Sequence, residues 1–555
     1  MRLRDVQMEA GGGALGVPPA PRADSGPRWP TLLLAALLTI LAALPILLVE
    51  TPPIFDYPNH LARVHILANL DRVPAFAAHF SADTLLLPNV LADMILLALE
   101  PVAGVEAAGK ALVLLLLALT VGGALALGAA AFGRLSPWPL LAAALAWNEV
   151  LMWGFLNYAL GIALLLWGLA AWLRFERTSR PWQLASAALF GLLLFLAHMV
   201  AFGLFAVAVA VVELARAWRH RRDGVGRNAR RLALSAAVFL PALALFLAVS
   251  PASGLPLDIR FIFTAWQKLS PFTRLLSTSN TGLDVATLAA VTLAVAGLLA
   301  SRRVRLHGPL ALVALVFALM VLTLPYTAMG SYFLDMRVAI AAALVLVAAL
   351  VPARPARRLA GAVLAGLVVL VGVRSAAMAQ DWMDQDRAYA AVRATLERLP
   401  RGAILIPAEA VPFELGDWTT TRRFRPAHEH TASLAVIARD AVVPNVFARK
   451  GQNPLVFTPA AESLQAVALN PVARVGTPPL LRRFIREVDD AVRDIHAMPG
   501  AAGAGVYVIL FNRGCGEWPR GLPAAPVACE ADHALMRMLP PKPDADEGIL
   551  VGSSS

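Results

Sequence analysis

The chain has 555 residues, of which 58% are hydrophobic and 15% are charged. Soluble globular proteins carry about 45–50% apolar and about 25% charged residues, so this composition excludes an ordinary soluble protein and indicates an integral membrane protein. The formal net charge is +11, but the arginines cluster in short connections between apolar segments, as the positive-inside rule describes, which argues against nucleic acid as a partner.

Residues 1–30 are rich in glycine, proline and arginine and are expected to form a disordered cytoplasmic tail. The apolar segment that follows, Thr31–Val49, begins too late and runs too far for an ordinary cleaved signal peptide, so it is predicted to be a retained first span. Its N-terminal side is expected to be cytoplasmic, because four arginines precede it.

The first loop, residues 50–110, opens with a stretch unlike its surroundings, Glu50–His65, which reads ETPPIFDYPNHLARVH. It places six polar side chains beside three prolines at a membrane surface: Glu50, Asp56, Asn59, His60, Arg63 and His65. Pro58 disfavours helix at Tyr57, and asparagine is a suitable N-cap residue, so a helix is predicted to begin near Asn59. His60 and Arg63 would then share one helix face.

Asp56 is the candidate for chemistry in this stretch. A carboxylate at the water–lipid boundary beside a histidine and an arginine could act as a base, as a metal ligand or as a substrate anchor. His60 is a second candidate base, because histidine titrates near neutral pH. The alternative is structural: Asp56 and Arg63 could form an ion pair that only fixes the loop.

A second apolar segment in the first loop, Pro88–Leu99, is short for a span and carries Asp93. Counting it as a span would put the basic connection 174–180 on the outer side. Asn89–Leu99 is therefore predicted to be an amphipathic helix on the outer membrane surface. Asn89 and Asp93 lie four residues apart and could close a site from above, although helix capping and simple amphipathicity explain them equally well.

Further apolar segments are predicted to bring the bundle to about eleven spans. In chain order they are Leu112–Phe132, Pro139–Met152, Phe155–Leu173, Leu184–Leu196, Ala201–Ala217, Leu232–Val249, Val285–Ala300, Leu310–Leu324, Val338–Val351 and Leu359–Val373. With these spans, all strongly basic connections fall on one side of the membrane, as the positive-inside rule requires. The longer connections of mixed charge fall on the outer side.

Polar residues near the outer ends of these spans are candidates for a substrate cavity, because burying them in lipid is costly. Glu149 lies between two spans in WNEVLMWGFLNY, and His198 interrupts LLLFLAHMVAFGLF. Both are interpreted as cavity-lining residues. As an alternative, each could cap a helix or bond a neighbouring span.

Two outer connections carry cations suited to a phosphate group. Arg260 and Lys268 lie in DIRFIFTAWQK and could hold a phosphate, since guanidinium groups make bidentate contacts with it. Anchoring at the interface beside aromatic residues is the alternative. Asp335 and Arg337, in GSYFLDMR, repeat the pattern at the mouth of another span, either as part of a phosphate site or as a salt bridge.

Residues 377–555 have a different composition and are predicted to form a small α/β domain on the outer face. The pattern predicts two amphipathic helices and two buried strands: Gln380–Leu399, Leu480–Ile495, Ala403–Ile406 and Gly505–Phe511. Cys515 and Cys529 would then lie in an oxidising compartment and pair, with free buried thiols as the alternative. The adjacent side chains of the run 428–430, HEH, are not expected to converge on one metal ion.

The layout of a first span, an acidic outer loop, a surface helix, a bundle and an outer C-terminal domain resembles the C-type (GT-C) membrane glycosyltransferases, which take sugars from polyprenyl-phosphate carriers. The resemblance covers about Trp29 to Arg374 in layout and the Asp56 stretch in motif. In that superfamily an acidic residue of the first outer loop is treated as the catalytic base or as a metal-associated group, and Asp56 is the matching position. The string DYPNHLAR is also similar to that of an uncharacterised group of bacterial polytopic proteins.

The resemblance implies an enzyme of the bacterial inner membrane that moves a sugar from a polyprenyl-phosphate-linked donor to a glycan, lipid or protein acceptor. Its bundle would comprise residues 31–376, its N-terminus would be cytoplasmic, and residues 377–555 would be periplasmic. Asp56 and His60 are assigned to catalysis. Substrate binding is assigned to the remaining polar candidates: Arg63, His65, Asn89, Asp93, Glu149, His198, Arg260, Lys268, Asp335 and Arg337.

An Asp-x-Asp motif is absent from the first loop, which leaves metal dependence open. A divalent cation at Asp56 is the one cofactor considered. Two other functions are retained as alternatives. A transporter or flippase of lipid-linked glycans would place its essential residues near the bilayer midplane. A non-catalytic envelope assembly protein would work through its outer domain and would not need Asp56.

Overall fold

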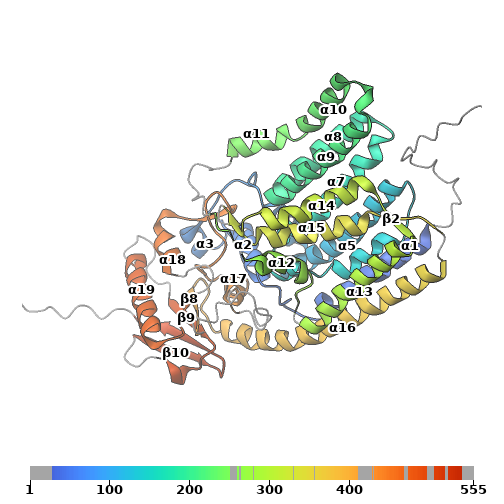
Figure 1. Ribbon diagram of the computed structural model, residues 1–555. Helices are drawn as coiled ribbons and strands as arrows, with labels where there is room; N and C mark the ends of the chain where they lie inside the picture. The colour runs from blue at the N-terminus through green and yellow to red at the C-terminus, as the bar shows by residue number, and fades with distance from the viewer. Residues whose placement is uncertain are drawn as a thin grey trace, which may run out of the picture.

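The computed structural model describes residues 28–249, 259–261, 264–278, 280–328, 331–354, 357–410, 428, 430–467, 473–496, 505–518 and 523–539. These residues form a helical bundle with a five-stranded sheet beyond one end of it (Figure 1). Eight helices within the described ranges are long and apolar enough to cross a membrane. The predicted fold class, a polytopic helical membrane bundle with a small C-terminal α/β part, is therefore confirmed.

The eight long helices follow the predicted apolar segments closely. They are α1 (Trp29–Leu47), α5 (Val105–Phe132), α7 (Leu156–Glu176), α8 (Arg180–Ala197), α9 (Met199–Arg219), the pair α10 (Val225–Ala237) and α11 (Leu240–Val249), α13 (Thr281–Ala300) and α16 (Arg357–Leu396). Two shorter apolar helices, α14 (Gly308–Thr323) and α15 (Leu334–Ala348), pack against each other. The central helix α7 is largely buried by protein, whereas the outer helices leave apolar side chains for lipid to cover.

One predicted span is wrong. The segment Pro139–Met152 forms a 3-10 helix, η1 (Trp138–Leu145), and a single turn, α6 (Glu149–Met152), that are both buried in the bundle. The Asn148 side chain accepts a hydrogen bond from the Leu151 N–H and caps α6, so a new helix starts there instead of continuing η1. The break leaves a non-helical corner inside the protein, where neighbouring backbone groups satisfy its hydrogen bonds.

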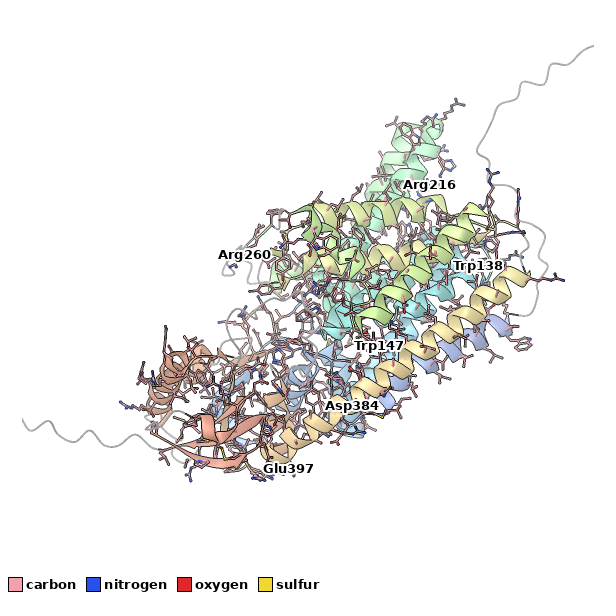
Figure 2. The ribbon with its side chains drawn as sticks, turned by 60° about the horizontal axis from the view of Figure 1, so that its bottom comes forward. Trp138, Trp147, Arg216, Arg260, Asp384 and Glu397 are labelled. Carbon is pink, nitrogen blue, oxygen red and sulfur yellow. A yellow bond between two sulfur atoms is a disulfide. The ribbon has the colours of Figure 1, made fainter. Side chains whose placement is uncertain are left out.

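The last span and the first predicted helix of the outer region are a single element. Figure 2 marks Asp384 and Glu397 along the part of α16 that extends beyond the bundle toward the sheet. At 1.5 Å per residue, its 40 residues reach about 60 Å. The prediction of two helices was wrong because residues 374–379 hold neither proline nor glycine, so nothing in the sequence stops the helix there.

The five-stranded sheet has the order β10-β11-β9-β6-β8. Its strands are β6 (Ile404–Glu409), β8 (Ala473–Arg474), β9 (Val506–Phe511), β10 (Ala524–Cys529) and β11 (His533–Met538). Strand β6 runs parallel to β8 and β9, and β11 lies antiparallel to β9 and β10. Every residue of β9 is buried, as expected for a central strand covered on both faces. The two strands predicted from the sequence are thus confirmed as the middle of the sheet.

Short helices surround the sheet and connect it to the bundle. They are α17 (Leu434–Arg439), α18 (Glu462–Val467) and the amphipathic α19 (Pro478–His496), the second predicted helix of this region. A disulfide joins Cys515 to Cys529, across the turn η7 (Cys515–Glu517) and the end of β10. The C-terminal region therefore contains one covalent link within its own sheet.

The first loop shares a core with the C-terminal region. Its elements are α2 (Tyr57–Asn69), α3 (Pro74–His79), β1 (Phe80–Ala82) and α4 (Leu91–Ala103). Strand β1 pairs antiparallel with β7 (Leu455–Phe457), and Phe80 packs on Phe457 with ring centroids 4.8 Å apart. Ala62, Ile66 and Phe76 are buried in the same apolar cluster as the strands of the sheet. The first loop and the C-terminal region are thus one packed unit.

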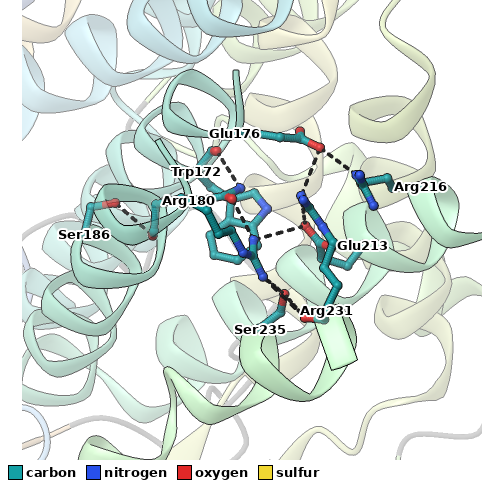
Figure 3. Close-up of polar contacts among 9 residues, drawn as sticks. Trp172, Glu176, Arg180, Ser186, Glu213, Arg216, Arg231 and Ser235 are labelled. Atoms are coloured by element: carbon teal, nitrogen blue, oxygen red, sulfur yellow. Dashed lines mark hydrogen bonds and ion pairs between the residues drawn. The ribbon is translucent and has the colours of Figure 1, made fainter. Parts of the chain in front are cut away.

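The basic connections gather at the opposite end of the bundle from the sheet (Figure 1). Two short strands there, β2 (Val304–Leu306) and β5 (Leu350–Pro352), pair antiparallel. Figure 3 shows a polar network that ties α7, α8, α9 and α10 together at their ends. Arg231 bonds Glu213 at 2.7 and 3.0 Å and Glu176 at 3.1 Å, and Arg216 pairs with Glu176 at 3.1 Å. Arginines predicted to set orientation therefore also hold helices together.

The remaining short elements close connections at the sheet end of the bundle. They are α12 (Ala265–Thr273) and the strand pair β3 (Thr327–Ala328) and β4 (Ser331–Tyr332). The backbone of Arg260 bridges to Thr327, which places Arg260 at this end, as labelled in Figure 2. The helix α12 packs against α14 and α15. These contacts bring the predicted outer connections close to the first loop and the C-terminal region.

Candidate active site

Asp56 lies immediately before α2, where the chain passes a corner of the bundle. Its N–H donates to the carbonyl of Trp153 at 3.1 Å, and the neighbouring Phe55 N–H donates to Met152 at 3.0 Å. Helix α2 begins at Tyr57, two residues earlier than predicted, because Pro58 occupies its first turn, where a missing N–H costs nothing. Asp56 holds the N-cap position, but its side chain makes no capping hydrogen bond to the helix. The carboxylate is therefore available for contacts with other residues.

Gly154 makes this arrangement possible. Its φ is +80°, and a Cβ at this position would lie 2.6 Å from the backbone nitrogen of Asp56 and 2.9 Å from its Cβ. A side chain there would push Asp56 away from its place. Glycine is therefore required at position 154 both by its backbone conformation and by the close approach of the first loop.

Replacing Gly154 by Ala is expected to lower kcat by about tenfold to a hundredfold, because a displacement of about 1 Å can cost that much in a positioned site. Gly104→Ala is the matched control, since Gly104 has a φ of +75° and nothing within 4 Å of its Cβ position. Both variants carry similar backbone strain, and only Gly154→Ala touches Asp56. Equal turnover of the two variants, measured in purified protein, would show that the position of Asp56 does not matter.

His430, from the C-terminal region, contacts the Asp56 carboxylate. The distance from His430 Nε2 to Asp56 Oδ1 is 3.3 Å, and the His430 side chain is 2% exposed. The ring also lies edge-on to Phe55 and Phe447, at centroid distances of 5.7 and 5.1 Å. In the sequence, His430 stands out only as a member of the HEH run, which is not expected to bind a metal ion. No local pattern indicates that it contacts Asp56, which lies far away in the chain.

The other residues of the HEH run do not join His430. The ring of His428 stacks on Phe511 with centroids 4.5 Å apart, and burial lowers the pKa of His428 to about 4, so it is neutral at physiological pH. Glu429 lies outside the described residues. Among the residues that the structure describes, no group of three or more His, Cys, Asp or Glu side chains could hold a metal ion.

Asn59 fixes the first loop to the C-terminal region rather than capping a helix. It lies within α2 and is fully buried. Its Oδ1 accepts from the N–H of Phe447 at 2.7 Å, and its Nδ2 donates to the carbonyl of Asn445 at 2.9 Å. Nδ2 also lies 2.9 Å from His430 Nδ1. The N-cap prediction for Asn59 was wrong because proline at position 58 starts the helix earlier.

Arg63 forms its ion pair with Asp93, not with Asp56. Arg63 Nη2 and Nε lie 2.6 and 2.9 Å from Asp93 Oδ1, and the two side chains are 1% and 0% exposed. Asn157 Nδ2 donates to Asp93 Oδ2 at 3.3 Å and to the carbonyl of Asn89 at 2.7 Å. The network of Arg63, Asn89 and Asp93 thus joins α2, α4 and α7. The Asp93 side chain points into the protein instead of closing a site from above.

His60 is held by the same network. Its Nδ1 lies 2.9 Å from Arg63 Nη2, and its ring also bonds the backbone of Gly154. Burial, aided by the charge of Arg63, lowers the pKa of His60 well below its usual range. A neutral imidazole with both nitrogens engaged is a poor proton acceptor, so Asp56 is the better candidate for the base.

Arg337 is a buried cation on α15, at the same corner of the bundle as Asp56. One Nη lies against His198 Nε2, and the guanidinium carbon lies 4.2 Å from the ring centre of Phe155. The Phe155 ring stacks on that of Trp153, whose carbonyl accepts from the Asp56 N–H. The Arg337 Nε has no hydrogen-bond partner, and no carboxylate of the described residues lies within ion-pair distance of the guanidinium.

His198 takes both roles of the alternative to cavity lining: it caps a helix and contacts a neighbouring helix. Its Nδ1 accepts from the N–H of Val200 at 3.0 Å and caps α9, while its Nε2 faces Arg337. Tyr158 also packs edge-on against this ring, with centroids 5.0 Å apart. His198 is thus a neighbour of the site through Arg337, and it is only 6% exposed.

Four of the remaining candidates are engaged in ion pairs elsewhere. Glu149 pairs with Arg274, Lys268 with Asp335 at 3.4 Å, and His65 with Asp440 at 3.2 Å. Asp335 and Arg337 are two residues apart on α15, so they point to nearly opposite sides of it. The structure therefore brings Arg337 and His198 to the corner where Asp56 lies, whereas Glu149, Lys268, Asp335 and His65 have ion-pair partners of their own. Arg260 is exposed at the end of the bundle.

No protein-family model and no curated protein matches this sequence. Among solved structures, the chain is similar to ArnT from Cupriavidus metallidurans bound to undecaprenyl phosphate, with a TM-score of 0.50 and 10% sequence identity. The alignment covers 92% of this chain and 98% of that chain. The apo state of the same protein aligns with a TM-score of 0.49, 10% identity and coverage of 91% and 97%. At this identity the similarity concerns the fold, which extends over the bundle and the C-terminal region together.

Proposed function

We propose that the protein is a C-type membrane glycosyltransferase that moves a sugar from a polyprenyl-phosphate-linked donor to a hydroxyl-bearing glycan, lipid or protein at the periplasmic face of the bacterial inner membrane. The observation that carries the proposal is the buried guanidinium of Arg337, which lies at the same corner of the bundle as Asp56 and has no carboxylate partner among the described residues. The fold, shared with a protein crystallised with undecaprenyl phosphate, supports a lipid-phosphate donor.

Asp56 and Arg337 would have different roles in the reaction. Asp56 would take the proton of the acceptor hydroxyl as the oxygen attacks the anomeric carbon of the sugar. The bond from that carbon to the lipid phosphate breaks, and the phosphate leaves with the bonding electrons. Arg337 would stabilise the negative charge that develops on the phosphate, an interaction that is strong in a buried site.

A divalent cation is not given a step in this reaction. The described side chains around the Asp56 carboxylate offer it one imidazole, His430, and one guanidinium, Arg337, which is itself a cation. Hard divalent cations require several oxygen ligands, and this set supplies only the one carboxylate. The residues therefore do not fit such a cation, and Arg337 would provide the positive charge instead.

The position of the site favours an enzyme over a transporter. Asp56 contacts His430 of the C-terminal region, and its helix shares a core with that region. A transporter would be expected to gather its polar residues near the bilayer midplane, within broken helices. Asp56 instead lies at the end of the bundle that packs on the C-terminal region, where it would act on a group presented at that face.

Arg337→Gln is expected to weaken the binding of undecaprenyl phosphate by about tenfold to a hundredfold, because a hydrogen bond to a charged group contributes about 1.5–3 kcal/mol. Binding is measured by native mass spectrometry of the purified protein titrated with the lipid. Arg387→Gln is the control, since Arg387 is exposed on the far part of α16. Unchanged affinity in Arg337→Gln would contradict the proposed phosphate site.

A further inference from the structure

The hydrogen bonds around Asn59 determine which nitrogen of His430 carries a proton. The N–H of Phe447 can only donate, so the Asn59 atom 2.7 Å from it is the oxygen Oδ1. The other atom is then the amide nitrogen Nδ2, which donates to the Asn445 carbonyl and to His430 Nδ1. Because Nδ1 accepts a hydrogen bond, the proton of the neutral ring is on Nε2, the atom 3.3 Å from Asp56.

The same contacts exclude two other roles for this histidine. A protonated ring would place an N–H on Nδ1 against the amide N–H of Asn59, so the ring does not become charged without breaking that contact. In a relay of the Ser-His-Asp kind, one imidazole nitrogen faces the carboxylate and the other faces the nucleophile. Here the second nitrogen is occupied by Asn59, so it cannot reach an acceptor hydroxyl.

We propose that His430 is a positioning residue: it donates its Nε2–H to the Asp56 carboxylate and holds it in the orientation that accepts the proton. This inference rests on the proposed transferase function. Phe55 and Phe447 confine the ring, and Asn59 fixes its rotation, so the donor has one direction. The C-terminal region thus completes the catalytic group of the first loop.

Among the described residues, the charged and titratable groups around this contact are assigned. His430 of the C-terminal region faces the Asp56 carboxylate, and Arg337 of α15 lies at the same corner of the bundle. His60 of α2 is a titratable neighbour of His430, and burial keeps it neutral. Removing the Nε2–H takes away the contact that orients the carboxylate, so it should lower turnover.

The test is a pair of variants with side chains of nearly equal size. His430→Gln keeps an N–H at the end of the side chain, and His430→Met fills the same space without a donor. We expect His430→Met to lower kcat by about tenfold to a hundredfold, because the carboxylate loses its donor. His430→Gln should rescue the donor and keep kcat within about fivefold of the parent protein.

Binding of undecaprenyl phosphate serves as the check on folding, because neither variant changes Arg337. Both should bind the lipid with the affinity of the parent protein. If His430→Gln loses activity as completely as His430→Met while binding is retained, the imidazole does more than donate a hydrogen bond, and the proposal is overturned. Equal, parent-like activity of both variants also overturns it. Activity that survives Asp56→Asn would instead reject the transferase mechanism itself.

Discussion

Asp56→Asn is expected to lower the turnover of sugar transfer by about a hundredfold to ten-thousandfold, the range that a positioned general base contributes. Asparagine has nearly the shape of aspartate and cannot accept the proton of the acceptor hydroxyl. It also leaves Arg337 in place, so binding of the lipid phosphate should be retained. Two measurements check this result: transfer by the purified protein in lipid nanodiscs, and mass spectrometry of envelope glycans from cells that carry the substitution.

The control for this variant is Asp71→Asn. Asp71 is an exposed carboxylate just beyond the other end of α2, so the substitution makes the same chemical change without touching the site. It should leave turnover within about twofold of the parent protein, as surface substitutions usually do. Parent-like transfer by Asp56→Asn would remove the assignment of Asp56 as the catalytic base.

Arg63→Leu is expected to lower the free energy of unfolding by about 3–5 kcal/mol, because it leaves the fully buried Asp93 carboxylate without its partner. Asp93→Leu should be similarly destabilising, since it strands the guanidinium. The double variant should be more stable than either single variant, because no buried charge then lacks a partner. Thermal unfolding of the purified proteins in one detergent compares all three with the parent protein.

The exposed pair of Arg387 and Asp384 provides the control for this prediction. Their side chains are 79% and 64% exposed, and their atoms lie 2.8 Å apart. Arg387→Leu should change stability by less than about 0.5 kcal/mol, because an exposed pair contributes little. A loss of transfer in Asp93→Leu with unchanged unfolding would show that the pair serves the substrate rather than the fold.

Most of the membrane helices, and Asp56 as a candidate residue, could be predicted from the sequence because both predictions rest on local properties. Apolar runs of sufficient length predict helices that cross a membrane, and a dense polar stretch behind the first span marks a site. The partner of Arg63 could not be read in this way. Asp56 and Asp93 are both carboxylates within reach in sequence, and only the packing of α4 against α2 decides between them.

The contact between His430 and the first loop is of a different kind. Asn59 and His430 are 371 residues apart, and neither lies in a periodic pattern that would indicate the other. The buried 3-10 helix η1 was also not predicted, because an apolar run looks the same whether it forms a span or a buried 3-10 helix. Long-range pairing of this sort depends on the complete tertiary fold, and a local window does not contain it.

The shared core has a consequence for how the protein is made. Strand β1 finds its partner only after residues 455–457 have been synthesised. At about 5–20 residues per second, translation of the intervening chain takes roughly 20–75 s. During that interval the apolar side chains that α2 and α3 bury against the sheet lack their partners. The newly made protein is therefore expected to need a chaperone for this loop, and to bring Asp56 and His430 together as the last event of its biogenesis.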